Sequence, residues 1–194
     1  MTSTTAEPSW GALLASQLAW HWEAQARPRL TGLTDDEYFF EPVPGCWSVR
    51  RAGAPAPAAQ FGTGPMRVDF AVDPADPPPV TTIAWRLSHL VVGVFGDRNA
   101  RYFDGPRIGY ESYAYPPTAA GALADLDAGY ARWMAGIGAL GPDGLAANCR
   151  EPGFESDSMA ALVLHIHREA IHHLAEIALL RDLWAHGLRP IRSG

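Results

Sequence analysis

Apolar residues recur along the chain at the three- and four-residue spacing of an α-helix, in four separate segments. In the first segment, Leu13, Leu14, Leu18 and Trp22 give a helical apolar pattern. The second is rich in Leu, Val and Ile. The pattern predicts four long helices, over residues 10–29, 81–103, 118–140 and 158–186.

Residues that start or stop helices stand at the ends of these segments. Ser9 is a suitable N-cap of the first helix, and Asp157 or Ser158 of the fourth, because their side-chain oxygens can accept a hydrogen bond from the first turn. Helix breakers stand at three other boundaries: Pro77-Pro78-Pro79, Gly141-Pro142 and Gly187.

Four helices with long connections predict an all-α fold, a four-helix bundle, rather than a Rossmann or sandwich domain. The connection over residues 32–80 is dense in Pro, Gly and Ala, and only residues 66–72 in it resemble a strand. Connections this long are usually functional or disordered, so we interpret this one as a lid or pocket wall. No internal repeat or domain linker is visible, and residues 1–194 are expected to form one domain.

The composition argues against several classes of function. The net charge is -6 and no dense basic segment is present, which argues against a nucleic-acid partner. All 15 basic side chains are Arg, so Schiff-base chemistry through Lys is excluded. Cys46 and Cys149 stand far apart, as expected of free thiols in a reducing compartment. No membrane span and no signal peptide are visible, so we expect a cytoplasmic protein without a membrane partner.

The last predicted helix carries a polar stripe. At about 100° per residue, one side of this helix presents His165, Glu169, His172, His173 and Glu176. Large apolar residues precede and follow these residues along the same side, so we expect the stripe to point into the core. A buried carboxylate beside imidazoles is costly unless its charge is compensated, and a divalent cation compensates it directly.

Glu169 and His173 are four residues apart and can reach one point beside the helix. A third ligand is expected from a facing helix, where His89 is the only histidine of the second predicted helix. We therefore predict one divalent metal ion held by His89, Glu169 and His173. This donor set suits Zn²⁺ first, and also Ni²⁺, Fe²⁺ or Mn²⁺. Without a metal, the same residues would form a hydrogen-bonded core histidine and an intrahelical ion pair.

Further polar residues near the predicted ligands are candidates for catalysis and substrate binding. His172 and Glu176 lie on the stripe and are candidates for a proton relay. Arg86, one turn before His89, is a candidate for holding an anionic group of the substrate. Trp47 and His165 are the other substrate-binding candidates, although core packing is an alternative for the tryptophan.

Other residues of these segments are interpreted as structural. His167 and Arg168 turn away from the stripe and are expected at the surface. Gly93 and Gly96 interrupt the second predicted helix at a cost of about 1 kcal/mol each, and we interpret them as sites of close helix packing. A tyrosine cluster within residues 110–115 could line a substrate pocket.

Three segments carry a resemblance to a known family: Pro44-Gly45-Cys46-Trp47-Ser48-Val49-Arg50, Leu87-Ser88-His89-Leu90, and residues 165–182. Together they resemble the DinB-like superfamily, whose helical bundle binds a metal through one His of the second helix and two ligands of the last. The resemblance covers nearly the whole chain and implies His89, Glu169 and His173 as ligands. Two features depart from the family pattern: Ala175-Glu176 after the last ligand, and the insert over residues 51–80.

Many members of this superfamily have His where this chain has Glu169. The combination of His, Glu and His resembles the mycothiol-dependent maleylpyruvate isomerase branch, which implies a low-molecular-weight thiol such as mycothiol as cosubstrate. The leading hypothesis is therefore a metal-dependent transferase or isomerase that activates a thiol and acts on a small molecule. A metal-dependent hydrolase is the alternative within enzymes. A non-catalytic alternative is a ligand-binding bundle or a structural metal site with His165 or His172 as fourth ligand, and a homodimer is also conceivable.

Overall fold

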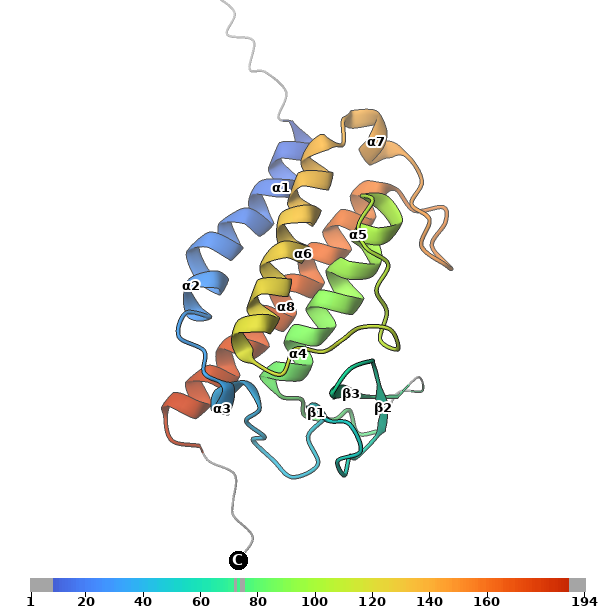
Figure 1. The fold of residues 1–194 in the computed structure, drawn as a ribbon. Coiled ribbons are helices and arrows are strands. Elements are labelled where there is room, and N and C mark those ends of the chain that lie inside the picture. Colours follow the sequence, from blue (N-terminus) through green and yellow to red (C-terminus); the bar gives the residue numbers. More distant parts are fainter. Residues whose placement is uncertain (1–8, 72, 74–75, 189–194) are drawn as a thin grey trace, which may run out of the picture.

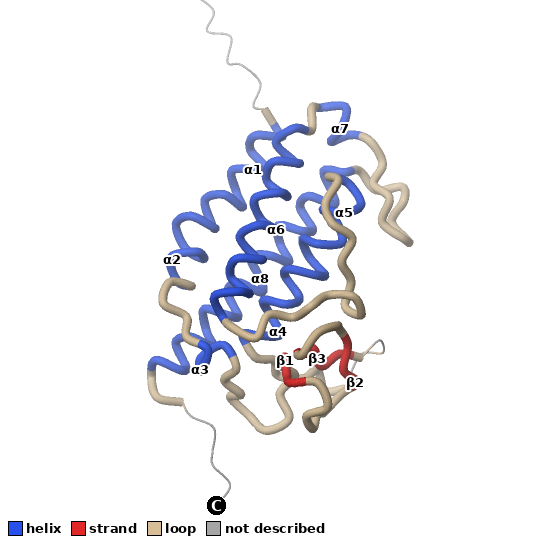
Figure 2. Tube along the Cα trace, viewed as in Figure 1, coloured by secondary structure: helices blue, strands red, loops and turns tan. Residues whose placement is uncertain are grey.

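The structure, a computed structural model, describes residues 9–71, 73 and 76–188 and is mostly helical (Figures 1 and 2). Within these residues four long helical segments lie side by side. They are α1 (Trp10–His21) with η1 (Trp22–Ala26) and α2 (Arg27–Arg29); α4 (Ile83–His89) with η2 (Leu90–Gly96) and α5 (Asp97–Tyr102); α6 (Ala119–Ala139); and α8 (Met159–Ala185). The short helices α3 (Asp35–Tyr38) and α7 (Pro142–Ala146) lie in connections. The segments η1 and η2 are π-helical.

The four predicted helices are confirmed, and hydroxyl side chains determine where each begins. In each case a Ser or Thr side chain accepts a hydrogen bond from the backbone N–H three residues later, which satisfies a donor that the helix leaves free. These caps are Ser9, Thr82, Thr118 and Ser158. Beyond the end of α8, Gly187 adopts a φ of 85°, a left-handed conformation that glycine reaches without strain.

The hydrophobic core fills the space between the four long segments. Helix α1 packs against α6 and α8, and α4 packs against the same two helices. Fully buried side chains include Leu18, Leu87, Leu126, Trp133, Ile166 and Ile177. Each such side chain stabilises the fold by about 1.5–3 kcal/mol relative to an exposed position.

A small antiparallel sheet lies at one end of the helices (Figure 2). Its strands are β1 (Val49–Arg51), β2 (Ala59–Phe61) and β3 (Met66–Phe70), in the order β1-β3-β2. The all-α prediction is wrong in this respect, because residues 32–80 contain a sheet as well as irregular chain. With three residues each, β1 and β2 are too short to show a strand periodicity. The strand-like segment 66–72 matches β3, and Val72 lies outside the described residues.

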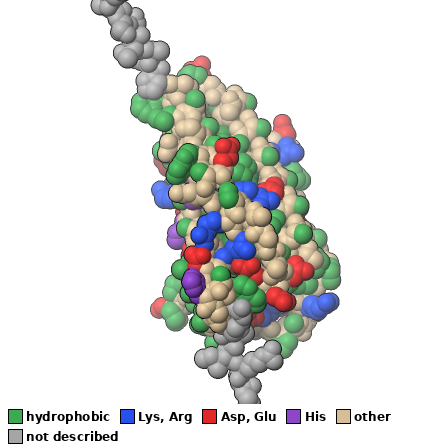
Figure 3. Space-filling model, turned by 90° about the vertical axis from the view of Figure 1, so that its left-hand side faces the viewer, with side chains coloured by type: hydrophobic (Ala, Val, Ile, Leu, Met, Phe, Trp, Pro, Cys, Tyr) green, Lys and Arg blue, Asp and Glu red, His purple; other side chains and the backbone are tan. Residues whose placement is uncertain are grey.

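The surface mixes apolar and polar side chains on the side of α1 (Figure 3). Exposed large apolar residues include Trp10 and Trp20 of α1 and Leu164 and Leu179 of α8. Among the described residues, no helix has both the length and the apolar character that crossing a bilayer requires.

A buried carboxylate joins the sheet to the start of α4. Asp69 in β3 is 0% exposed, and its Oδ2 accepts hydrogen bonds from the Ser48 backbone N–H at 2.9 Å and from Arg50 Nε at 2.8 Å. Trp85 Nε1 donates to the Asp69 carbonyl oxygen at 2.7 Å. The hydroxyls of Ser48 and Thr82 share a further hydrogen bond of 2.9 Å. These bonds set the position of the first turn of α4 relative to β3.

We predict that Asp69→Ala lowers the free energy of unfolding by about 3–5 kcal/mol, because Arg50 and the Ser48 N–H lose a buried partner. Urea unfolding followed by circular dichroism measures the change. Arg67→Ala is the matched control, since Arg67 is in the same strand and, among the residues that the structure describes, its guanidinium bonds only to backbone oxygens of Gly64 and Met66. Equal losses in both variants would show that the Asp69 network does not stabilise the fold.

Candidate metal centre

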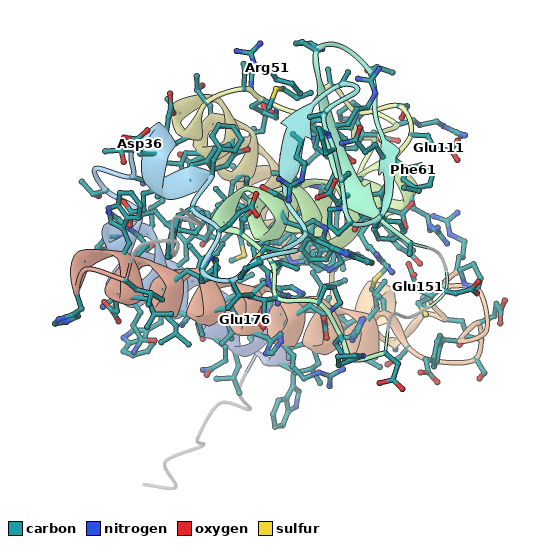
Figure 4. All side chains as sticks on the ribbon, turned by 90° about the horizontal axis from the view of Figure 1, so that it is seen from below. Asp36, Arg51, Phe61, Glu111, Glu151 and Glu176 are labelled. Atoms are coloured by element: carbon teal, nitrogen blue, oxygen red, sulfur yellow. The ribbon has the colours of Figure 1, made fainter. Side chains whose placement is uncertain are left out.

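The predicted ligands lie where α4 packs against α8. His89 is the last residue of α4, while Glu169 and His173 lie in the middle of α8. In Figure 4, α4 runs between α8, which carries Glu176, and the sheet, which carries Phe61. Trp85 stacks on the His89 ring with the ring centroids 5.3 Å apart and an interplanar angle of 13°.

His173 contacts both of its predicted partners. Its ring centroid lies 4.7 Å from that of His89, with the two rings nearly perpendicular at 87°. Its Nε2 lies 3.8 Å from Glu169 Oε2. On the other edge of the ring, Nδ1 lies 2.8 Å from Glu176 Oε2 and donates a hydrogen bond to that carboxylate. His173 is 7% exposed, so these groups replace most of its contact with water.

The two imidazoles use the same nitrogen for their hydrogen bonds. His89 Nδ1 lies 2.5 Å from the hydroxyl oxygen of Tyr110, and His173 Nδ1 is bonded to Glu176. In both rings Nε2 is the nitrogen left for another ligand. Metal-ligating histidines usually have this arrangement, with the second nitrogen held by a carboxylate or another polar group.

Both imidazoles are held in the neutral form that metal coordination requires. Burial, together with the neighbouring groups His173, Arg86 and Arg98, lowers the pKa of His89 to about 3. Burial also lowers the pKa of His173, although the hydrogen bond from His173 to Glu176 opposes this effect. At neutral pH His89 therefore carries a single ring proton, and with that proton on Nδ1 a cation at Nε2 displaces none.

Arg86 is part of the centre, in a different role from the predicted one. Its Nη1 donates to Glu176 Oε2 at 2.9 Å and lies 3.1 Å from His173 Nδ1. Burial lowers the pKa of the Arg86 guanidinium, and the charge of Glu176 opposes that shift. The guanidinium that we predicted to hold a substrate anion thus has a carboxylate of the protein as its partner.

Glu169 differs from Glu176 in its surroundings. Within the part of the chain that the structure describes, neither of its carboxylate oxygens takes part in a hydrogen bond. Its nearest basic nitrogens are Nδ1 of His165 and Nε2 of His173, each at 3.8 Å, and Nε of Arg168 at 4.0 Å. This carboxylate, next to the neutral imidazole of His173, is suited to a divalent cation.

A second, overlapping set of residues is closer together. Among the described residues, His172, His173 and Glu176 offer ligand atoms that all lie within 4.8 Å of one another, so this His/Glu group could hold a metal ion. His172 Nε2 lies 3.5 Å from Glu176 Oε1. However, the Glu176 carboxylate already bonds to His173 Nδ1 and Arg86. The predicted set instead uses Nε2 of His173, which faces the unbonded carboxylate of Glu169.

The polar stripe runs from the core to the solvent. At about 100° per residue its five members cover roughly 100° of the helix, in the angular order His173, Glu169, Glu176, His165, His172. The exposed fractions of these side chains are 9%, 32%, 31%, 44% and 60%, so exposure is lowest at His173, nearly equal at Glu169 and Glu176, and highest at His172. The expectation that the whole stripe points into the core is therefore wrong for His165 and His172.

The remaining predicted residues lie around this centre. His165 lines a cavity of about 670 Å³ together with Arg98, Glu151 and Arg168. The centroid of the Trp47 ring lies 6.3 Å from that of Trp85, and Trp85 in turn stacks on His89. Trp47 is therefore linked to His89 through the Trp85 ring. Sequence reasoning did not identify Tyr110 as a partner of His89. Its position in a tyrosine cluster was the only signal.

Comparison with known proteins matches most of the chain to one family. A family model described as the DinB superfamily matches residues 17–177, which include α4 and all five residues of the polar stripe. No curated protein and no solved structure matches the chain.

His167 is buried, which corrects the expectation that it lies at the surface. It is 4% exposed, and its ring meets the edge of Trp133 with the centroids 6.2 Å apart. Arg168 is exposed, as predicted. Burial lowers the pKa of His167 to about 4, while a hydrogen bond with the Leu14 backbone opposes the shift. The helical angle placed His167 off the stripe, but that side of α8 faces other helices and not water.

We predict that His167 makes the metal-free protein less stable in mild acid. Its pKa is lower in the folded state than the ordinary value of about 6.5, so its contribution is complete above that pH and is lost as the pH falls towards 4. The free energy of unfolding should fall by up to about 1.4 kcal/mol per pH unit from this residue. His167→Gln should remove that part of the slope in urea unfolding at pH 7, 6 and 5. His186→Gln, at an exposed position, is the control. An unchanged slope in His167→Gln would contradict the assignment.

Proposed function

The chain belongs to the DinB superfamily, and on that premise we propose that it is a metal-dependent enzyme whose ion is held by His89, Glu169 and His173. We interpret the four packed helical segments as the four-helix bundle of this superfamily. One observation carries the proposal: the neighbouring neutral imidazoles of His89 and His173 both have engaged Nδ1 atoms, and Nε2 of His173 lies 3.8 Å from the Glu169 carboxylate, which has no hydrogen bond among the described residues.

The donor set favours a divalent cation of intermediate softness. Two imidazole nitrogens and one carboxylate suit Zn²⁺, which is the expected ion, and Ni²⁺, Fe²⁺ or Mn²⁺ accept the same set. Three protein ligands are typical of catalytic sites, whereas structural zinc sites usually have four. Because His172 is largely exposed and lies against Glu176, we assign it no ligand role.

The chemistry that we propose is activation of a low-molecular-weight thiol for transfer or isomerisation. A divalent ion supplies Lewis acidity, which lowers the pKa of a thiol or water molecule that reaches it. The mycothiol-dependent branch is favoured by Glu169 at the first ligand position of the last helix. A hydrolase would use the same ligands with water as nucleophile.

We propose roles for two further residues, Glu176 and His172, in handling the proton that such activation releases. Glu176 Oε1 lies 3.5 Å from His172 Nε2, while Glu176 Oε2 accepts from His173. His172 is 60% exposed, so its imidazole can exchange protons with bulk water. We propose that Glu176 orients His173 and that His172 passes protons between the centre and solvent.

The small-molecule substrate is proposed to lie in the cavity beside α8. His165 borders this cavity, and its Nδ1 is 3.8 Å from Glu169 Oε1, so a ligand in the cavity can approach the Glu169 side of the centre. Trp47 and Trp85 form an aromatic wall next to His89 and support binding of an apolar group. Arg86 contributes by holding Glu176 in place.

We predict that the protein, purified without a tag or chelator, contains about one divalent ion per chain, as three protein ligands on one centre imply. His89→Ala, Glu169→Ala and His173→Ala should each lose it, while His172→Ala should retain it. Plasma mass spectrometry measures the metal, and circular dichroism verifies that each variant stays helical. Loss of metal in His172→Ala with retention in His89→Ala would assign the ion to His172, His173 and Glu176 instead.

The cobalt-substituted protein should distinguish thiol chemistry from hydrolysis. We expect a low-molecular-weight thiol, tested with mycothiol and with cysteine, to produce a sulfur-to-metal charge-transfer band, because coordination favours the thiolate. The same titration of Glu169→Ala should give no band. If wild-type protein gives none with either thiol while retaining cobalt, hydrolysis or a binding role replaces the thiol proposal.

A further inference from the structure

The connection between α5 and α6 brings one phenol to the predicted ligand of α4. Tyr110 lies in this connection, and its hydroxyl oxygen is 2.5 Å from His89 Nδ1. The Phe70 ring of β3 stacks on Tyr110 with the centroids 4.4 Å apart and an interplanar angle of 21°. Tyr110 is therefore fixed between the sheet and the helical segment that carries His89.

Hydrogen bonds hold the connection against the turn between β2 and β3 and also brace it internally. The Thr63 backbone N–H donates to the Tyr113 carbonyl oxygen at 2.9 Å, and the Tyr115 hydroxyl donates to the Tyr110 carbonyl oxygen at 3.0 Å. A tyrosine phenol is uncharged at neutral pH. A neutral oxygen in a fixed position can accept a hydrogen bond without adding charge to the centre.

Gly93 makes this close approach possible. A Cβ at this position would lie 2.5 Å from the Tyr110 hydroxyl oxygen, which is closer than real contacts allow, and 3.0 Å from His89 Nδ1, which is unusually tight. A Cβ at Gly96 would likewise collide with the Ile108 side chain, at 2.5 Å. Both glycines therefore accommodate the connection before α6, which corrects our interpretation that they allow two helices to pack closely.

We propose that Tyr110 is a positioning residue for His89 and that Gly93 provides the space it needs. When Nε2 of His89 is a metal ligand, the ring proton is on Nδ1 and is donated to the Tyr110 oxygen. This bond fixes both the tautomer and the rotation of the ring. The inference rests on the proposed metal centre, but it concerns residues outside the ligand set. Loss of a hydrogen-bond partner of a metal-ligating histidine typically weakens metal binding about 10- to 100-fold.

The test compares two tyrosines that each lose one hydroxyl. Tyr113 is the matched control, because it lies three residues later and its hydroxyl donates to Asp125 instead. Zinc and cobalt affinities are measured by competition with a chromophoric chelator for wild type, Tyr110→Phe and Tyr113→Phe. We expect an affinity about 10- to 100-fold weaker in Tyr110→Phe and no change in Tyr113→Phe. The cobalt absorption bands should also shift in Tyr110→Phe alone.

A second variant and a second readout separate positioning from folding. Gly93→Ala keeps the phenol but moves it away from the ring, so it should weaken metal binding in the same way. The ¹⁵N shifts of His89 in the metal-free protein should report an altered tautomer balance in both variants. Equal affinities in wild type, Tyr110→Phe and Gly93→Ala would overturn the inference and leave the metal centre standing. Absence of metal binding in wild type would overturn both.

Discussion

A single carboxylate oxygen, Oε2 of Glu176, joins the two helices that carry the candidate metal centre. It accepts from Arg86 of α4 at 2.9 Å and from His173 of α8 at 2.8 Å. The ion pair between Arg86 and Glu176 compensates the charge of the Arg86 guanidinium, which is largely buried. The hydrogen bond between His173 and Glu176 orients the His173 imidazole. Removing one partner of such a pair leaves an uncompensated charge, at a cost of about 3–5 kcal/mol. The same interaction thus stabilises the contact between α4 and α8 and determines which nitrogen His173 presents.

Helix α4 is held at both ends by groups that are distant in sequence. Asp69 of the sheet fixes its first turn through Ser48 and Trp85, while Tyr110 contacts its last residue. Between these points Arg86 is bonded to α8. The sheet and the connection before α6 therefore place His89 as firmly as the helices do. The segment that contains Trp47, which carried part of the family resemblance, contributes chiefly to this support.

The sequence predicted the features that depend on local periodicity. The four helices, and the predicted caps Ser9 and Ser158, follow from residues close together in the chain, whereas the caps Thr82 and Thr118 were not predicted. The sheet was missed because two of its strands are too short to show alternation. The interactions of Arg86 and Tyr110 were missed because their partners come from other elements. His167 shows a third limit, since a helical angle tells which residues share a side but not what that side faces.

The cations of these networks are all guanidinium groups, because the chain contains no lysine. Guanidinium keeps its proton in proteins at pH values where lysine ammonium groups have already begun to dissociate. The pair of Arg50 with Asp69 should therefore persist in strongly alkaline solution. The chain also offers no side-chain amine to acylating reagents, so lysine-directed labelling and crosslinking leave these networks unmodified.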